Sequence, residues 1–227
     1  MNTKWKLIVA VGIVVVLLAS SLVIAHLEYV ASQAADDKLA RVACLGDSIT
    51  QETGYPADLQ ALLGNRSVVG NFGATGATVN VYSDIPYYYD PAFHRVRSFA
   101  PTTVIIMLGT NDAHNDTYKL IDNFMNNYTR ILTRIENYSS KPQIFVVLPP
   151  PVFNNTLGVN GTAYMEGVIP RIQQVAKQLD LPIIDVYTPL LNHPEYFPDG
   201  LHPNGDGAKV IADTIYKAIN PQPSWLF

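Results

Sequence analysis

Residues 103–108, Thr-Val-Ile-Ile-Met-Leu, form a continuous apolar run with turn-forming residues on both sides. A short run without polar alternation predicts a strand that is buried on both faces, as in the centre of a parallel sheet. Parallel strands need long crossover connections, which helices usually supply. This run therefore favours an α/β fold, provided that other strands alternate with helices along the chain.

The rest of the chain shows that alternation. Besides residues 103–108, strands are predicted at residues 41–45, 67–71, 143–148 and 182–186. Helical periodicity and end signals predict helices at residues 56–63, 91–99, 120–137, 166–179 and 206–219. Five strands with helical crossovers predict a doubly wound parallel sheet that helices cover on both faces.

The first 25 residues have a different character. Lys4 and Lys6 precede residues 7–25, which carry no charge. That length fits a membrane-spanning helix and exceeds the usual apolar region of a signal peptide. A secreted form, cleaved after Ala25 or Ala34, is the alternative, and both interpretations place the following domain outside the membrane. The expected organisation is an anchor or signal segment (1–25), a linker (26–40), a folded domain (41–220) and a tail (221–227).

Composition narrows the classes of partner. The 227-residue chain has a formal net charge of -4 and an isoelectric point near 5.7, so no basic surface is expected for nucleic acid. The single cysteine, Cys44, lies in the first predicted strand, which leaves no disulfide framework and no cysteine metal site. No obligate protein partner is evident.

Asn-x-Ser/Thr sequons are frequent, which favours an exported glycoprotein; an Asn-rich neutral surface is the alternative. The sequons begin at Asn65, Asn115, Asn127, Asn137, Asn154 and Asn160.

Polar residues and glycines follow four of the predicted strands, at carboxyl ends that meet at one edge of a parallel sheet. Ser48 follows the first strand and is a candidate nucleophile, which needs a base to remove its proton. His202 can be that base. Asp199, three residues earlier, can accept a hydrogen bond from the imidazole Nδ1 and so fix its tautomer. Asp185, at the end of the fifth strand, is a weaker candidate for the same role.

Three further donors suit an oxyanion hole at that edge. They are the backbone N–H of Ser48, the backbone N–H of Gly73 and the side-chain amide of Asn111. We expect Gly73 and Gly76 to let the backbone bend so that an N–H points into the site.

These segments resemble the signature blocks of the SGNH (GDSL-type) hydrolase superfamily. The matching residues, in the order of that family, are Gly46-Asp47-Ser48, Gly73, Gly109-Thr110-Asn111-Asp112 and Asp199-Gly200-Leu201-His202. The resemblance covers residues 41–219. It implies a three-layer α/β/α sandwich of flavodoxin-like type, a Ser48–His202–Asp199 triad, an oxyanion hole of Ser48, Gly73 and Asn111, and no metal or organic cofactor.

A narrower resemblance concerns the substrate. Segments such as Asn71-Phe72-Gly73, residues 148–153 and residues 197–204 are similar to exported carbohydrate O-acetylesterases of the sialate O-acetylesterase-like and acetylxylan esterase-like kinds. The resemblance implies a serine esterase that hydrolyses short, chiefly acetyl, esters of sugars. A lipid, aryl-ester or thioester hydrolase of the same superfamily is the alternative, and a non-catalytic carbohydrate-binding module is a further one.

Other residues near these loops are candidates for substrate contact. Tyr82, Tyr87 and Tyr88 either form an aromatic wall for a sugar or cover the edge of the sheet. His114 follows the Asn111 loop, and Pro150 belongs to a stiff Pro-Pro-Pro segment beside the site. Asp47 and Asp112 are expected to brace their own turns rather than to take part in chemistry.

Overall fold

The computed structural model describes residues 2, 13, 16–28 and 39–220. It separates the chain into two compact units, residues 1–39 and 40–227, of which the first contributes a helical stretch at residues 16–28. Within the described ranges, no helix combines the length and the apolar character that crossing a membrane requires. The predicted segment 7–25 lies partly outside the described residues, as do most of the linker and the whole tail.

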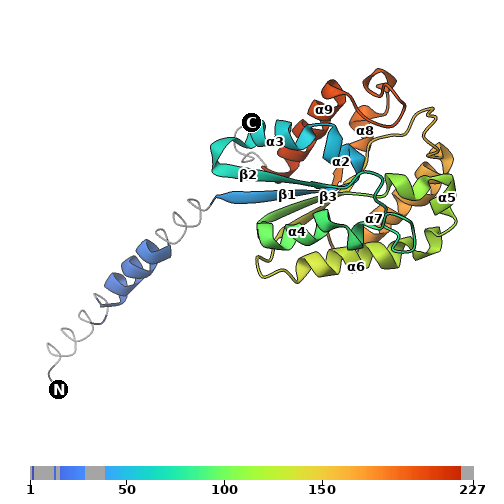
Figure 1. Cartoon of the computed structure of the whole chain (residues 1–227). Helices are drawn as coiled ribbons and strands as arrows, with labels where there is room; N and C mark the ends of the chain where they lie inside the picture. The colour runs from blue at the N-terminus through green and yellow to red at the C-terminus, as the bar shows by residue number, and fades with distance from the viewer. Residues whose placement is uncertain (1, 3–12, 14–15, 29–38, 221–227) are drawn as a thin grey trace. The chain divides into compact units, whose positions relative to one another are not determined.

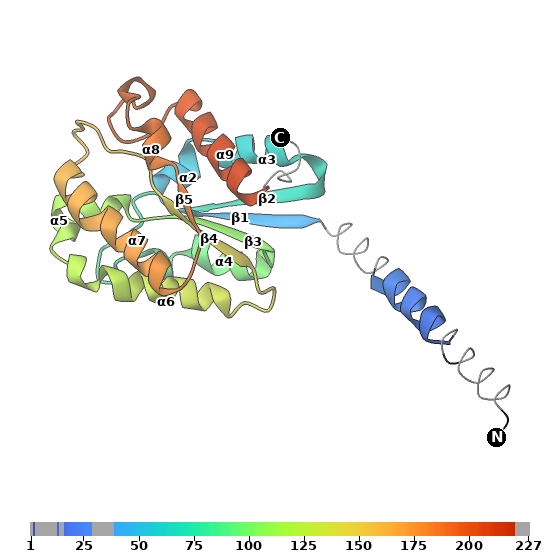
Figure 2. The ribbon, with the colours of Figure 1, turned by 180° about the vertical axis from the view of Figure 1, so that it is seen from behind.

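The second unit (Figure 1) is built on a five-stranded parallel sheet with the strand order β2-β1-β3-β4-β5, and all five strands are labelled in Figure 2. The strands are β1 (Ala40–Gly46), β2 (Ser67–Gly73), β3 (Thr103–Met107), β4 (Gln143–Leu148) and β5 (Ile183–Asp185). This confirms the predicted α/β class and the parallel sheet.

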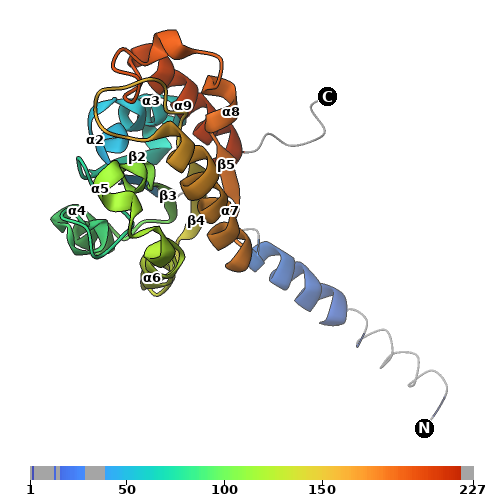
Figure 3. The ribbon, with the colours of Figure 1, turned by 90° about the vertical axis from the view of Figure 1, so that its right-hand side faces the viewer.

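Helices cover both faces of the sheet and make three layers (Figures 1–3). One face carries α3 (Tyr55–Leu63) and α9 (Gly205–Ile219). The other carries α4 (Pro91–Phe99), α6 (Phe124–Glu136) and α7 (Ile169–Gln178). Both faces need cover because both are apolar. In β1, Ala43 and Leu45 belong to one hydrophobic cluster, whereas Val42 and Cys44 belong to the cluster on the opposite face.

Shorter elements fill the connections. The α-helical ones are α2 (Ser48–Glu52), α5 (Asn115–Tyr118) and α8 (Tyr187–Leu190). The 3-10 turns are η1 (Gly64–Arg66), η2 (Tyr87–Tyr89), η3 (Thr110–Ala113), η4 (Ile121–Asn123) and η6 (Pro194–Tyr196), and η5 (Ala163–Val168) is a π-helical turn.

Two predicted helices differ from the structure. The helix expected at residues 120–137 is interrupted, because the amide of Asn80 donates to the Leu120 carbonyl (2.7 Å) and a tighter Asn123-to-Leu120 bond replaces the α-helical pattern. The helix expected from residue 166 begins as the π-helical turn η5 and becomes α-helical only at Ile169. Both irregular segments follow loops at the carboxyl edge of the sheet.

Candidate active site

Ser48 is the first residue of α2 and follows β1 after a sharp turn. The turn depends on Gly46, because a Cβ atom there would lie 2.4 Å from the Met107 carbonyl oxygen. Asp47 caps α2: its Oδ1 accepts the N–H of Ile49 (3.0 Å). Asp47 therefore has the bracing contact that the sequence predicted. The Ser48 N–H belongs to the first turn of a helix, where N–H groups have no intrahelical acceptor.

Ser48, His202 and Asp199 form one hydrogen-bonded line. Oγ of Ser48 lies 2.9 Å from Nε2 of His202, and Nδ1 of His202 lies 2.7 Å from Oδ2 of Asp199. The other oxygen of Asp199 accepts the backbone N–H groups of Leu201 (2.9 Å) and His202 (2.7 Å). One carboxylate thus fixes both the loop and the ring. This places a proton on Nδ1 and leaves Nε2 free to accept from Ser48.

These contacts also set the charge of Asp199. Burial would raise the pKa of Asp199, but the hydrogen bonds from the His202 N–H, the imidazole and the Leu201 N–H outweigh it and lower that pKa. A carboxylate that stays ionised can stabilise an imidazolium beside it.

The loop after β4 is hydrogen-bonded to the loop that carries Asp199. The Phe153 N–H donates to the Gly200 carbonyl (2.8 Å). Gly200 has φ +80°, and a Cβ atom on it would lie 2.2 Å from the Asn154 carbonyl oxygen. Only glycine suits both the left-handed backbone and this close approach.

Asn111 lies in η3, after β3. Its Nδ2 donates to the Ala77 carbonyl (3.0 Å), which leaves the second N–H of the amide for another acceptor. Asp112 accepts the N–H groups of Val79 (2.8 Å) and Asn80 (3.0 Å), so the β3 loop and the β2 loop are tied together. Asp112 therefore also has the bracing contacts that the sequence predicted.

Gly73 differs in two respects from its prediction. Its φ is not among the positive ones, and its requirement is steric: a Cβ atom would lie 2.4 Å from the Gln51 nitrogen of α2. Its N–H already donates to Oδ1 of Asn71 (2.9 Å), so a substrate oxygen would have to share or replace that contact.

No role for the Asn71 side chain was predicted from the sequence. Its Nδ2 donates to the carbonyls of Thr50 (2.9 Å) and Gln51 (3.2 Å), which joins β2 to the helix that carries Ser48. An asparagine two residues before a glycine gives no signal of such a bridge until the two elements are seen in contact.

Two buried carboxyl groups lie below the site. Burial raises the pKa of Asp47 to about 6, against the hydrogen bond from the Ile49 N–H. Burial also raises the pKa of Asp112 to about 7, against the bonds from Val79 and Asn80. Among the described residues, Oδ2 of Asp47 and Oγ1 of Thr110 have no hydrogen-bond partner. Burying such polar groups without a hydrogen-bond partner lowers the stability of the folded state.

Two of the predicted substrate-contact residues are buried in the structure. Tyr87 has no exposed surface, and its hydroxyl donates to the Phe72 carbonyl (2.6 Å). Pro150 is also buried, and its carbonyl accepts the Tyr164 hydroxyl (2.8 Å).

The remaining candidates lie in different surroundings. Tyr88 packs against Phe93 and lies under the guanidinium groups of Arg130 and Arg134 from α6, which favours the sheet-covering role. Tyr82 is 70% exposed. His114 lines a cavity of about 230 Å³ together with Asn111 and residues 76–85 of the loop after β2. This cavity was not predicted from the sequence.

Asp185, the rival partner for the histidine, is engaged elsewhere: its carboxylate accepts the N–H (2.9 Å) and the hydroxyl (2.6 Å) of Thr188 at the start of α8. The buried Asn127, whose amide donates to Asn80, is unsuited to carry a glycan.

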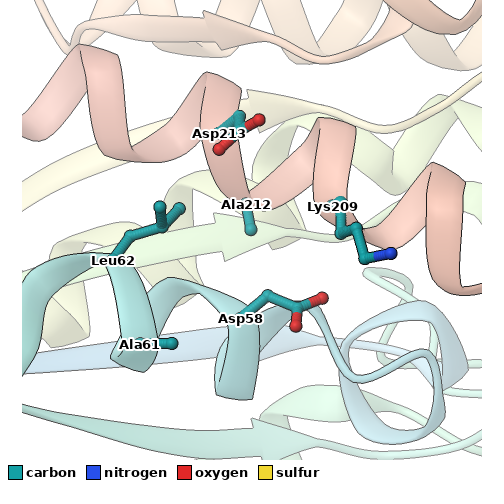
Figure 4. Close-up of a pocket in the computed structure, with 6 residues that line it drawn as sticks. All are labelled: Asp58, Ala61, Leu62, Lys209, Ala212 and Asp213. Atoms are coloured by element: carbon teal, nitrogen blue, oxygen red, sulfur yellow. The ribbon is translucent and has the colours of Figure 1, made fainter.

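Two other hollows lie elsewhere, and neither they nor the cavity at His114 are lined by Ser48, Asp199 or His202. One, of about 360 Å³, lies between α3 and α9 and is lined by Asp58, Leu62 and Asp213 among others (Figure 4). Another, of about 380 Å³, lies along residues 152–165. Across the described part of the chain, no group of three or more His, Cys, Asp or Glu side chains is placed to bind a metal ion.

Residues 44–210 match the model of the GDSL-like Lipase/Acylhydrolase family. An acetylxylan esterase of Xylanibacter ruminicola is 32% identical over 205 residues, which are 79% of this chain and 43% of that protein. The chain thus spans less than half the length of that relative.

Solved structures share the fold. The acetyl xylan esterase AlAXEase superposes with a TM-score of 0.63 at 21% identity, covering 79% of this chain and 99% of its own. The inhibitor-bound aryl esterase of M. smegmatis gives 0.63 at 18% identity, covering 79% and 98%.

Proposed function

Because the chain belongs to the family of GDSL-like lipases and acylhydrolases, we propose that it is a serine carboxylic ester hydrolase. The observation that carries the proposal is the line from Ser48 Oγ through the His202 ring to Asp199, with contacts of 2.9 and 2.7 Å. A serine hydroxyl becomes a nucleophile when a base accepts its proton, and a base is effective when a third group orients it.

The first half of the reaction forms an acyl-enzyme. Nε2 of His202 takes the Ser48 proton as Oγ bonds to the ester carbonyl carbon. The carbonyl oxygen becomes an oxyanion, which the Ser48 N–H and the second N–H of the Asn111 amide stabilise, with Gly73 as a shared donor. The bond to the alcohol oxygen then breaks, and His202 gives that oxygen the proton.

The second half repeats these steps with water. His202 removes a proton from water, the hydroxide attacks the acyl carbon, and the bond to Oγ breaks. Ser48 regains its proton and the carboxylic acid leaves. Asp199 stays ionised throughout and stabilises the imidazolium that forms twice in each cycle.

An acetylated sugar is the proposed substrate. Ser48 is buried (6% exposed), which suits a short acyl group. The acetylxylan esterase relative supports the acetyl ester of a carbohydrate. An aryl ester is the second candidate substrate, because an aryl esterase shares the fold.

We also propose that the domain is exported, since Lys4 and Lys6 precede the uncharged residues 7–25. A membrane anchor and a cleaved signal are the two forms of this proposal. Fractionation of cells expressing the full chain, followed by N-terminal sequencing of the product, distinguishes them.

The activity is tested with p-nitrophenyl esters of increasing acyl length and with acetylated polysaccharides. The wild type should prefer acetyl over long acyl esters, release acetate from the polysaccharides and be labelled by a fluorophosphonate at Ser48. Ser48→Ala should lose turnover and labelling while keeping its melting temperature. Full turnover by that variant would contradict the mechanism, and a preference for long acyl esters would contradict the acetyl substrate.

A further inference from the structure

The cavity of about 230 Å³ shares one lining residue, Asn111, with the proposed oxyanion hole. The side-chain amide of Asn111 also donates to the Ala77 carbonyl (3.0 Å) in the loop after β2. The β2 loop forms one wall, and α5 with the residue before it forms the other. The part of a substrate that extends past the Asn111 donor would therefore enter this cavity.

Its size and lining suit a single sugar ring. The volume of about 230 Å³ is below the usual range for drug-sized ligands. Thr117 and Ser83, whose hydroxyl donates to the Asn80 carbonyl (2.9 Å) and can still accept, belong to the lining, and Ile85, which is 46% exposed, adds an apolar surface. Hydroxyl groups can pair with the hydroxyls of a sugar, whereas the apolar surface can contact its C–H face.

The charges at the cavity are all of one sign. Asp84 and Asp116 line it, and no lysine or arginine does; Lys119, two residues after Thr117, is not part of the lining. His114 also lines the cavity, and its Nδ1 lies 3.3 Å from the Asp116 backbone nitrogen and 3.9 Å from Oδ2 of Asp116. A substrate carboxylate would meet like charges and no cation.

We infer that this cavity is the sugar subsite of the proposed esterase and that Asp84 and Asp116 select uncharged sugars over acidic ones. The inference rests on the proposed function and refines it. Acetyl esters of neutral sugars, such as those of a xylan backbone, become the favoured class. Esters of sialic or uronic acids are disfavoured by the repulsion of their carboxylates.

A matched pair of substrates tests the inference. Acetylated methyl glucuronoside with its free carboxylate and the same compound as a carboxamide differ in charge and share one ring. At pH 8 and low ionic strength, kcat/KM for acetate release should be about tenfold higher for the carboxamide. The ratio should fall toward one at about 1 M salt, because salt screens exposed charges.

Equal or faster release from the carboxylate would overturn the inference and leave the esterase proposal intact. So would activity on p-nitrophenyl acetate with no release from either sugar. Absence of turnover on all three esters would overturn the proposed function and the inference with it.

Variants assign the effect to the two carboxylates. The double variant Asp84→Asn, Asp116→Asn keeps the side-chain volumes and should bring the carboxamide-to-carboxylate ratio close to one. Asp58→Asn with Asp213→Asn, in the separate cavity between α3 and α9 (Figure 4), removes the same number of charges and should leave the ratio unchanged. An unchanged ratio in the Asp84, Asp116 variant, or an equal fall in the control, would refute the assignment.

Discussion

Nε2 of His202 lies 2.9 Å from Oγ of Ser48, although 154 positions separate the two residues in the chain. The parallel sheet makes this contact possible. Ser48 follows β1 near the middle of the sheet, whereas His202 follows β5 at its edge, and both loops emerge at the same end. The loop from β5 reaches the nucleophile because the Phe153 N–H and the carboxylate of Asp199 hold it in place.

The role of Asp199 is tested by Asp199→Asn. The amide oxygen can still accept the N–H groups of Leu201 and His202, but the amide nitrogen would face Nδ1 of the imidazole. The ring would then carry its proton on Nε2, where it cannot accept from Ser48. We expect kcat for p-nitrophenyl acetate to fall by ~10³–10⁴-fold with little change in KM.

Asp185→Asn is the control for that variant, because Asp185 contacts Thr188 and is not bonded to the histidine. Its kcat should stay within about twofold of the wild type, as for most substitutions remote from the chemistry. A larger loss in Asp185→Asn than in Asp199→Asn would show that the wrong carboxylate has been assigned.

The Asn111 amide is tested by Asn111→Ala. If one N–H stabilises the oxyanion, the change should cost about 2.7–4 kcal/mol of transition-state stabilisation, or ~10²–10³-fold in kcat. Loss of the bond to the Ala77 carbonyl should also lower the melting temperature slightly. Comparison of kcat with the fraction folded separates the two effects, and a fully folded variant with unchanged kcat would exclude Asn111 from the oxyanion hole.

Gly73→Ala tests the close approach of α2 to β2. A Cβ atom would lie 2.4 Å from the Gln51 nitrogen, so α2 would have to move together with Ser48. We expect a loss of about 1–3 kcal/mol in unfolding free energy and a lower kcat. Gly205→Ala is the matched control, since no atom lies within 4 Å of a Cβ atom there. Chemical denaturation of both variants measures the difference, and equal stabilities would contradict the steric argument.

The five strands could be predicted from the sequence because the signals for strands and turns are local. Apolar runs and turn residues predicted five parallel strands, and the prediction that Ser48, Asn111, Asp199 and His202 follow their carboxyl ends needed nothing further. The pairing of Asp199 with His202 was also accessible, since a spacing of three residues within one loop brings a carboxylate to the imidazole.

Contacts between segments that are distant in the sequence could not be predicted from it. Tyr87 was predicted either to contact a sugar or to cover the edge of the sheet, and its hydroxyl donates to the Phe72 carbonyl in the core. The break before α6 arises because Asn80, far away in sequence, occupies the Leu120 carbonyl. Asp84 lies in the loop after β2 and Asp116 in α5, and the two line one cavity only in the folded chain.

The buried Asp47 should make stability depend on pH. Its pKa in the folded state is about 6, whereas an exposed aspartate has a pKa near 3.9. The folded state therefore holds this proton more tightly than the unfolded state does. The contribution to stability is fully present below about pH 4 and is lost as the pH rises through about 6.

Asp47→Asn should remove most of that loss. The amide oxygen can keep the bond from the Ile49 N–H, and the amide nitrogen can donate to the Thr110 hydroxyl, which is close enough to lower the pKa of Asp47. We expect the variant to gain about 1–3 kcal/mol over the wild type at pH 8 and much less at pH 4. Because Asp112 keeps a raised pKa, some pH dependence should persist. Urea denaturation from pH 4 to 8 measures the difference, and parallel curves for the two proteins would mean that Asp47 is ionised at no cost in the folded state.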